Sequence, residues 1–384
     1  MRILYDHQTF VLQKFGGISR YFTQIISNFP ENVSVDISVK YSDNVYLKEL
    51  KKYEIENIYN PCDKFACNLK FKGKGLIFKL VRKLSPDKYA NCETKNINLS
   101  IEKLKAKNYD LFHPTYYNDY FIEHIGNKPF VLTIHDMIHE LYPELLNDMN
   151  LSIRKAALAK KASHIISVSE NTKKDIIDIL NIPEEKISVI YHASSLPAKK
   201  NILANLPEKY FLFIGERDGY KNFMFFVEAI APILKEQNDI FVVCTGRKFN
   251  SKENKILKDL NIRDNFIYVF IEEDELSSVY NQAIAFVFPS YYEGFGIPIL
   301  EAFESDCPLI LSNTSCFPEI AKDCALYFNP KDMKQMRKCM ENIIDNNTLR
   351  RSLTDKGKIR VKDFSWADSS NKTLEVYSRV LKNE

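Results

Sequence analysis

Two carboxylates eight residues apart, Glu293 and Glu301, are the part of this sequence best suited to chemistry. They lie in Phe288–Ala302, a loop that follows an apolar run and opens a helical pattern. Gly294 and Gly296 would let the backbone approach a ligand closely, and free amides at the helix start can bind an anion or a hydroxyl group. A structural glycine turn, with Glu301 serving only the helix dipole, explains the same residues. The residues alone leave both interpretations open.

A cationic turn occurs earlier in the chain, between Gly215 and Phe223. Arg217 offers a planar fork and Lys221 a point charge, and this pair suits a diphosphate at the end of a strand. Both cations would stabilise the negative charge on a leaving nucleotide. The alternative is a solvated turn in which Asp218 caps the next helix.

Two further turns carry candidate ligand contacts. Gly16 and Gly17 precede a helical pattern, which is a weak signal by itself, and the absence of GxGxxG counts against a nicotinamide-dependent dehydrogenase. His135 and Asp136 follow the apolar run Phe130–Ile134, where a histidine beside an acid can carry a proton or hold a ligand. A satisfied structural histidine is the usual alternative. Three other histidines remain unassigned: His113, His139 and His192.

A pair of glutamates also occurs in glycoside hydrolases, where the two act as acid and base. That function fits poorly, because Glu301 belongs to a helix and hydrolysis has no use for the cationic turn. The chain contains no DxD, whose paired carboxylates commonly hold a diphosphate through a metal ion. We therefore expect no metal site and no metal requirement.

The elements that position these residues alternate along the chain. Short apolar runs separated by amphipathic helical patterns predict parallel sheets covered on both faces, an α/β architecture with ligands at the carboxyl ends of the strands. Examples of such runs are 130–134, 164–168, 210–214, 240–244 and 285–288.

The length of 384 residues favours two domains. Residues 196–207 are rich in turn formers and predict a linker. We expect an N-terminal Rossmann-like domain over 1–195 and a C-terminal one over 208–364. The final segment, 365–384, has helical spacing and is expected to join the first domain.

Composition excludes several classes of protein. Apolar residues make up 45% of the chain and the formal net charge is only +3, so nothing indicates disorder or nucleic-acid binding. We expect no signal peptide, because the N-terminal apolar run is short, and no apolar run is long enough to span a membrane. The eight cysteines are scattered without a CxxC pair. We expect a cytoplasmic protein with reduced thiols.

One stretch, residues 64–88, combines basic and apolar side chains. Seven lysines and Arg82 alternate with residues such as Phe71, Phe78 and Leu80, and Asp87 is the only acid among them. This pattern suits peripheral contact with an anionic membrane surface, where each nearby cation contributes about 1 kcal/mol. A solvated helix face with a lysine-rich loop is an equally good explanation.

The loop at Phe288–Ala302 resembles the E-x7-E signature of retaining family 4 glycosyltransferases of the GT-B kind, which have two Rossmann-like domains facing each other across a cleft. The segments 308–310, 318–320 and 327–332 continue that resemblance in order. It extends over nearly the whole chain, is strongest over 215–332, and is weakest over 33–108, within the domain that binds the acceptor in this family.

The resemblance implies a role for each candidate. Glu301 would hold the ribose hydroxyls of the nucleotide, and Glu293 would lie against the donor sugar beside the amides of Gly294, Phe295 and Gly296. His135 would contact the donor sugar, with Asp136 supporting it. The cationic turn resembles the family's Arg/Lys pair, although Tyr220 stands where many members have arginine, which makes Arg217 the weaker match to Lys221. The turn at Gly16 and Gly17 resembles the glycine loop that closes over the donor phosphates.

The implied activity is retaining transfer of a hexose from a nucleotide-diphosphate sugar, with no further cofactor. The pattern is most similar to bacterial mannosyltransferases, so GDP-mannose is the first donor to consider. A saccharide or polyprenyl-linked acceptor of lipopolysaccharide O-antigen or capsule synthesis is expected. Two alternatives are a nucleotide-sugar 2-epimerase of the same fold and a non-catalytic membrane-associated assembly partner.

Overall fold

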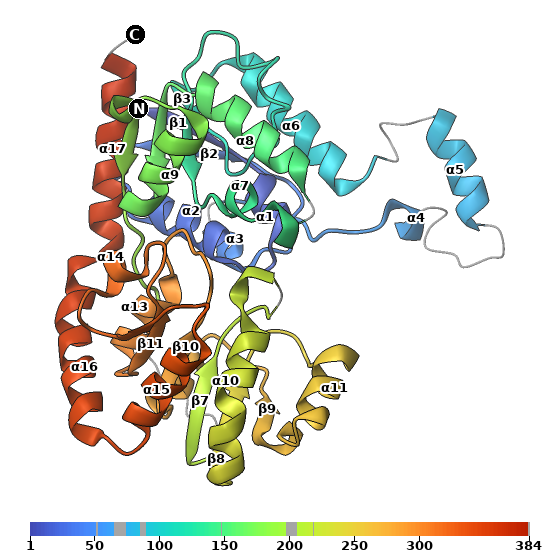
Figure 1. Ribbon diagram of the computed structural model, residues 1–384. Coiled ribbons are helices and arrows are strands. Elements are labelled where there is room, and N and C mark those ends of the chain that lie inside the picture. Colours follow the sequence, from blue (N-terminus) through green and yellow to red (C-terminus); the bar gives the residue numbers. More distant parts are fainter. Residues whose placement is uncertain are drawn as a thin grey trace.

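The computed structural model describes residues 1–50, 53–64, 74–84, 90–146, 148–196, 206–217 and 219–382. It contains two bodies of parallel strands covered by helices (Figure 1). The α/β architecture expected from the alternating pattern is therefore confirmed. Of the predicted linker, residues 197–205 lie outside the described residues, as does Asp218.

The N-terminal body holds six short parallel strands in the order β2-β1-β3 followed by β4-β5-β6. A bridge between Phe112 and Phe130 links the two groups. Nearly all of their residues are buried, because helices cover both faces. The strands are β1 (Arg2–Asp6), β2 (Ser34–Ser38), β3 (Leu111–His113), β4 (Val131–Ile134), β5 (His164–Ser167) and β6 (Ile187–Val189).

Side-chain caps fix the starts of several helices in this body. The side chain of Asn91 accepts a hydrogen bond from the Thr94 amide at the start of α6, and Ser169 does the same for Thr172 in α9. The helices are α1 (Gln8–Leu12), α2 (Gly17–Ser27), α3 (Val45–Glu49), α4 (Pro61–Lys64), α5 (Lys74–Leu84), α6 (Cys92–Ala106), α7 (Ile138–Leu141), α8 (Met149–Lys161) and α9 (Glu170–Leu180).

The C-terminal body is one six-stranded sheet in the order β12-β11-β10-β7-β8-β9. Its strand order reverses between β7 and β10, which are neighbours, and ligands of open α/β sheets bind at such a point. The strands are β7 (Lys209–Phe213), β8 (Ile240–Cys244), β9 (Phe266–Tyr268), β10 (Ala285–Phe288), β11 (Leu309–Ser312) and β12 (Leu326–Phe328). The helices are α10 (Phe223–Glu236), α11 (Ser251–Asp259), α12 (Leu276–Asn281), α13 (Ile297–Glu304), α14 (Phe317–Ala321), α15 (Met333–Ile344) and α16 (Asn347–Arg360).

The last helix, α17 (Trp366–Lys382), returns to the N-terminal body and lies along it (Figure 1). The buried Tyr377 hydroxyl is 2.6 Å from the Tyr5 hydroxyl and 2.6 Å from Nδ1 of His113. Ser370 donates to the carbonyl of Ile25 in α2 at 2.8 Å. These contacts attach the C-terminal segment to the first domain.

The basic stretch at 64–88 is only partly described, since residues 65–73 and 85–89 lie outside the described residues. Within it, α5 stands beside the N-terminal body and away from both sheets (Figure 1). Ile77, Lys79 and Lys83 of this helix are exposed. None of the described helices is long and apolar enough to cross a membrane.

Replacing Tyr377 by phenylalanine tests the attachment of α17. The change leaves the Tyr5 hydroxyl and Nδ1 of His113 without their shared partner in a buried site, so the unfolding free energy is expected to fall by about 1–3 kcal/mol. Urea unfolding followed by circular dichroism measures this change. The control is Tyr268→Phe, which alters a half-buried tyrosine of β9 and is expected to have little effect. Equal losses in the two variants would contradict the bridging role.

Candidate functional site

Two loops at the point of reversed strand order bring Lys221 and Glu293 together. Lys221 follows β7 and Glu293 follows the neighbouring β10, and Nζ of Lys221 lies 2.6 Å from Oε1 of Glu293. Ser290 donates to the same carboxylate oxygen at 2.7 Å. Although burial opposes the charge on Lys221, Glu293 and Tyr220 together outweigh this effect and raise the lysine pKa above its usual value. The site therefore holds a charged lysine at the carboxyl ends of two adjacent strands.

The second glutamate, Glu301, is buried in α13 and has a different set of partners. Its Oε1 accepts from Nη1 of Arg20 at 3.0 Å, and its Oε2 accepts from the Tyr280 hydroxyl at 3.0 Å. Burial raises the pKa of Glu301, while Arg20 and Tyr280 oppose that rise. Arg20 belongs to α2, so an ion pair joins the two domains at this carboxylate.

A cavity of about 580 Å³ opens beside this ion pair and is lined by both domains. Arg20 lies on its wall and is also paired with Glu273, which lines the same cavity. Its apolar wall comes from both sides of the interface: Phe15 and Tyr46 from the N-terminal domain, and Ile214, Val269 and Ile271 from the C-terminal domain. An aromatic ring with polar edges would fit such a space.

At Gly294 the backbones of the two domains approach each other closely. A Cβ atom built at Gly294 would lie 1.6 Å from the carbonyl oxygen of His135. The Gly294 carbonyl accepts from Ser169 at 2.7 Å and from Thr172 at 3.3 Å. We expected this glycine to admit a ligand. In the structure it admits the backbone of the other domain, while Gly296, with φ of 86°, forms the turn that begins α13.

His135 and Asp136 lie at the end of β4, directly against that loop. The His135 side chain is buried, and its Nε2 has no hydrogen-bond partner among the described residues. Burial lowers its pKa to about 4, so the ring is neutral near pH 7. Its backbone amide donates to the Tyr117 hydroxyl at 3.1 Å. A buried, neutral and unpartnered ring nitrogen beside the domain interface is available to a ligand hydroxyl.

Lys155 stabilises the turn at His135 and Asp136. Its ammonium group is fully buried, donates to the Asp136 carbonyl at 3.0 Å and pairs with Glu140 at 2.9 Å. The Asp136 carboxylate accepts from the Ile138 amide at 3.1 Å, so it stabilises the turn.

The glycine turn before α2 faces the same interface. A Cβ atom at Gly17 would lie 3.6 Å from Cδ1 of Ile297 in α13, and one at Gly16 would collide with the Gln13 side chain. The Phe295 ring packs edge-on against His192 at 4.9 Å. The structure thus brings Gly16, Gly17, His135, Asp136 and the segment 293–301, which runs from the loop into α13, to one interface.

The sequence matches two protein families along its length. The family model for glycosyl transferases group 1 matches residues 194–360, and that for glycosyltransferase family 4 matches residues 15–194. The chain belongs to these glycosyltransferases. The two matched regions meet at residue 194, beside the predicted linker.

Similar proteins include the O-antigen chain mannosyltransferase RfbU of Salmonella typhimurium, with 30% identity over 55% of this chain and 60% of that protein. The O-antigen chain mannosyltransferase B of Escherichia coli is 26% identical over 71% of this chain and 74% of its own length. The alignment to RfbU therefore spans less than two thirds of that relative.

Solved structures establish the fold. Anabaena Alr3699/HepE, crystallised with UDP and glucose, aligns with a TM-score of 0.72 and 15% identity over 99% of this chain and 100% of that one. A sucrose-phosphate synthase from Thermosynechococcus elongatus aligns with a TM-score of 0.72 and 17% identity, covering 100% and 99% of the two chains. The GT-B fold expected from the sequence is confirmed.

Arg217 of this glycosyltransferase does not join Lys221. Its guanidinium group is buried, pairs with Glu253 at 3.1 Å and donates to the Thr245 carbonyl at 3.0 Å. It also lies over the Phe249 ring, at 4.8 Å. We predicted that Arg217 and Lys221 form one diphosphate site, but in this structure Arg217 is turned into its own domain, where it fixes the loop after β8.

Arg20 and Tyr280 were not predicted, although both bind Glu301. Arg20 lies three residues after Gly17, in the turn that the sequence analysis had already singled out by its two glycines, and its positive charge was the available signal. Tyr280 gave no such signal, because it comes close to Glu301 only when α12 packs against α13 in the folded protein.

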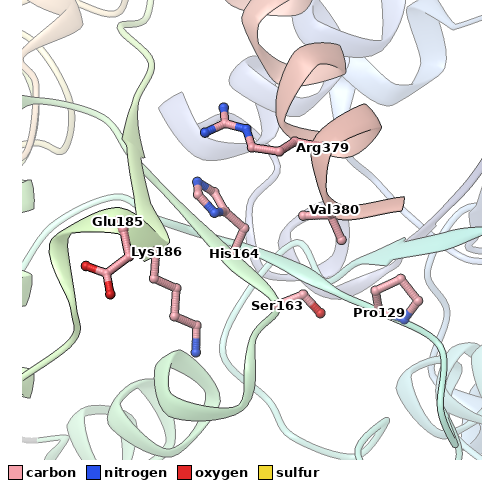
Figure 2. Close-up of a pocket in the computed structure, with 7 residues that line it drawn as sticks. All are labelled: Pro129, Ser163, His164, Glu185, Lys186, Arg379 and Val380. Carbon is pink, nitrogen blue, oxygen red and sulfur yellow. The ribbon is translucent and has the colours of Figure 1, made fainter. Parts of the chain in front are cut away.

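A second cavity, of about 410 Å³, lies at the opposite ends of the N-terminal strands (Figure 2). His164 and Lys186 come from the amino ends of β5 and β6, and Arg379 comes from α17 (Figure 2). Burial, with Arg379 and Lys186 adding to it, lowers the pKa of His164 to about 4. None of the predicted site residues lines this cavity.

Substituting alanine for Gly294 tests the close approach of the domains. Because the atoms that a Cβ would meet belong to the backbone of His135 and Asp136, they cannot move aside as a flexible side chain would. The unfolding free energy is expected to fall by roughly 1–3 kcal/mol. Thermal unfolding measures the loss. Gly17→Ala, where a Cβ has ordinary contacts, is the control and should be at least as stable as wild type. A Gly294→Ala protein of wild-type stability would show that the domains do not meet in this way.

Proposed function

We propose that this chain is a retaining glycosyltransferase that moves a hexose, in the first instance mannose from GDP-mannose, to a lipid-linked or oligosaccharide acceptor of O-antigen or capsule synthesis. The observation that carries the proposal is the charged pair of Lys221 and Glu293 at the reversed strand order. Glu301 lies farther along in α13 and is paired with Arg20, which lines the interdomain cavity. The names of similar proteins support the mannosyl donor.

In this proposal the nucleotide spans the cavity and the two loops. The ribose hydroxyls donate to Glu301, and the diphosphate takes Lys221 as its counterion. Glu293 and the neutral His135 ring would then contact the sugar of the donor. Lys221 is held in place by Glu293 before the donor binds, so little reorganisation is needed when charge develops on the leaving group.

The chemical step exchanges one bond at the anomeric carbon for another. The bond from C1 to the diphosphate oxygen breaks, and the acceptor oxygen bonds to C1 on the same face. The acceptor proton passes to the departing diphosphate, whose negative charge Lys221 stabilises. We propose that no metal ion is required, because a lysine is available to balance this charge.

The cavity suits guanine. Three consecutive acidic residues, Glu272, Glu273 and Asp274, line it. Guanine carries an N–H and an NH₂ group side by side, which can donate two parallel hydrogen bonds to one carboxylate, whereas uracil offers a single N–H between two carbonyl oxygens. Because Glu273 is already paired with Arg20, we propose that the exposed Glu272 carboxylate accepts from guanine, which would favour GDP over UDP.

We also propose that the protein acts in the cytoplasm, in peripheral contact with the membrane that carries the acceptor. The support is the basic and apolar stretch at 64–88, of which the described helix α5 exposes Ile77, Lys79 and Lys83. A polyprenyl-linked acceptor would be presented at that surface.

A nucleotide panel tests the donor site. GDP, UDP, dTDP, ADP and CMP are added in thermal-shift measurements with and without EDTA. A ligand at 100 times its dissociation constant adds about 2.7 kcal/mol of stability, and we expect GDP to do so regardless of EDTA. Stabilisation that disappears with EDTA would refute the metal-free proposal, and stabilisation by none of the nucleotides would favour the non-catalytic partner.

Two variants separate binding from transfer. Glu301→Ala should weaken nucleotide binding, whereas Glu293→Ala should mainly slow transfer of labelled mannose to a polyprenyl-linked acceptor. Analysis of the product distinguishes the enzyme classes, because a 2-epimerase would yield a product without a glycosidic bond. Wild-type nucleotide affinity in Glu301→Ala would refute the ribose assignment.

A further inference from the structure

Arg20 is the only residue described above that touches the proposed ribose-binding carboxylate from the opposite domain. Its side chain is 10% exposed and belongs to α2, one turn after Gly16 and Gly17. Nη1 donates to Glu301 at 3.0 Å, and Nη2 donates to the Tyr46 hydroxyl at 2.8 Å and to Glu273. The guanidinium group also stacks over the Tyr46 ring at 4.9 Å. Arg20 is thus held in one orientation by three partners.

The charges around Glu301 make its protonation state depend on the contact with Arg20. Glu301 and Glu273 are two carboxylates that share one guanidinium group. The other titratable groups facing them are Tyr280 from α12 and Tyr46 and Glu49 from α3. None of these adds a positive charge. Without Arg20, the buried Glu301 carboxylate beside the partly exposed Glu273 would favour taking up a proton.

We propose that Arg20 is a positioning residue of the donor site, which keeps Glu301 an ionised and oriented acceptor for the ribose hydroxyls of a nucleoside diphosphate. The inference rests on the proposed function, because it takes Glu301 as the ribose ligand. It adds that the donor site is incomplete without the N-terminal domain.

Two features support a role beyond joining the domains. The Tyr280 hydroxyl occupies Oε2 of Glu301, so Arg20 fixes the remaining oxygen and leaves its second lone pair available. Arg20 also lines the interdomain cavity itself, within reach of a bound nucleotide. Donor binding and domain closure are consequently linked through one ion pair, and each should strengthen the other.

If the ion pair between Arg20 and Glu301 served only to join the domains, a different result would be expected. Its loss would loosen the interface and lower stability, with no particular dependence of nucleotide binding on pH. Glu319 offers a matched control, because its carboxylate accepts the amides of Glu170 and Asn171 across the same interface at 2.7 and 3.0 Å, and it does not line the cavity.

The test is titration of GDP and UDP into Arg20→Met, Glu319→Gln, Glu301→Ala and wild type, by calorimetry between pH 6 and pH 8. We expect Arg20→Met to bind GDP roughly tenfold more weakly at pH 8. The reason is that Glu301 loses the charged hydrogen bond from Arg20 that orients it toward the ribose. Binding by Arg20→Met should weaken further as pH falls to 6, because the unpaired carboxylate takes up a proton. Wild type and Glu319→Gln should show only the pH dependence that ionisation of the terminal phosphate of the nucleotide, with a pKa of about 6, gives to every variant. Arg20→Lys, which keeps a positive charge, should restore the wild-type profile.

The outcomes separate this inference from the proposed function. Wild-type affinity in Glu301→Ala, or no binding of either nucleotide to wild type, refutes the proposed donor site and the inference with it. Weak binding by Glu301→Ala together with a wild-type profile in Arg20→Met overturns the role of Arg20 alone. Should Arg20→Met fail to fold, Arg20→Gln removes the charge while retaining a hydrogen-bond donor, and the same profile is measured.

Discussion

The backbone of Gly294 meets the carbonyl of His135 so closely that no side chain fits between them, and this approach governs how the two domains can sit. It fixes the loop between β10 and α13 against the end of β4. On one side of that contact, the Tyr292 hydroxyl donates to Asp175 at 2.5 Å. On the other, Arg20 reaches Glu301. The loop that carries Glu293 is therefore shaped by both domains, although its residues all belong to one.

The charged groups of the site are already paired with one another before any donor binds. Lys221 pairs with Glu293, and Arg20 pairs with Glu301 and Glu273; all but the partly exposed Glu273 are largely buried. Burying an ion pair costs free energy that its geometry must offset, and removing one partner leaves the other charge unsatisfied. A nucleotide diphosphate brings two kinds of group to this arrangement: negative oxygens for the lysine and hydroxyl donors for the glutamate. The site is thus preorganised for that chemical class.

The sequence predicted the parts of this arrangement that depend on local pattern. Alternating apolar runs predicted the parallel sheets, and Glu293, Lys221 and His135 each follow a strand at the interface. Side-chain direction could not be predicted in the same way. Arg217 lies four residues before Lys221 but turns into its own domain, because Glu253 and two carbonyl oxygens satisfy it there. Contacts between domains, such as Arg20 with Glu301, join residues 281 positions apart and leave no local signal.

Hydrogen exchange measured with and without GDP-mannose tests the central claim most directly, namely that one donor site is assembled from both domains. The account predicts that the ligand slows exchange together in residues 290–301, in the segment 16–20 and in the turn 135–137. Exchange at the cavity around His164 and Arg379 should not change. Protection confined to the C-terminal domain, or appearing first around His164, would contradict a shared site at the Gly294 interface.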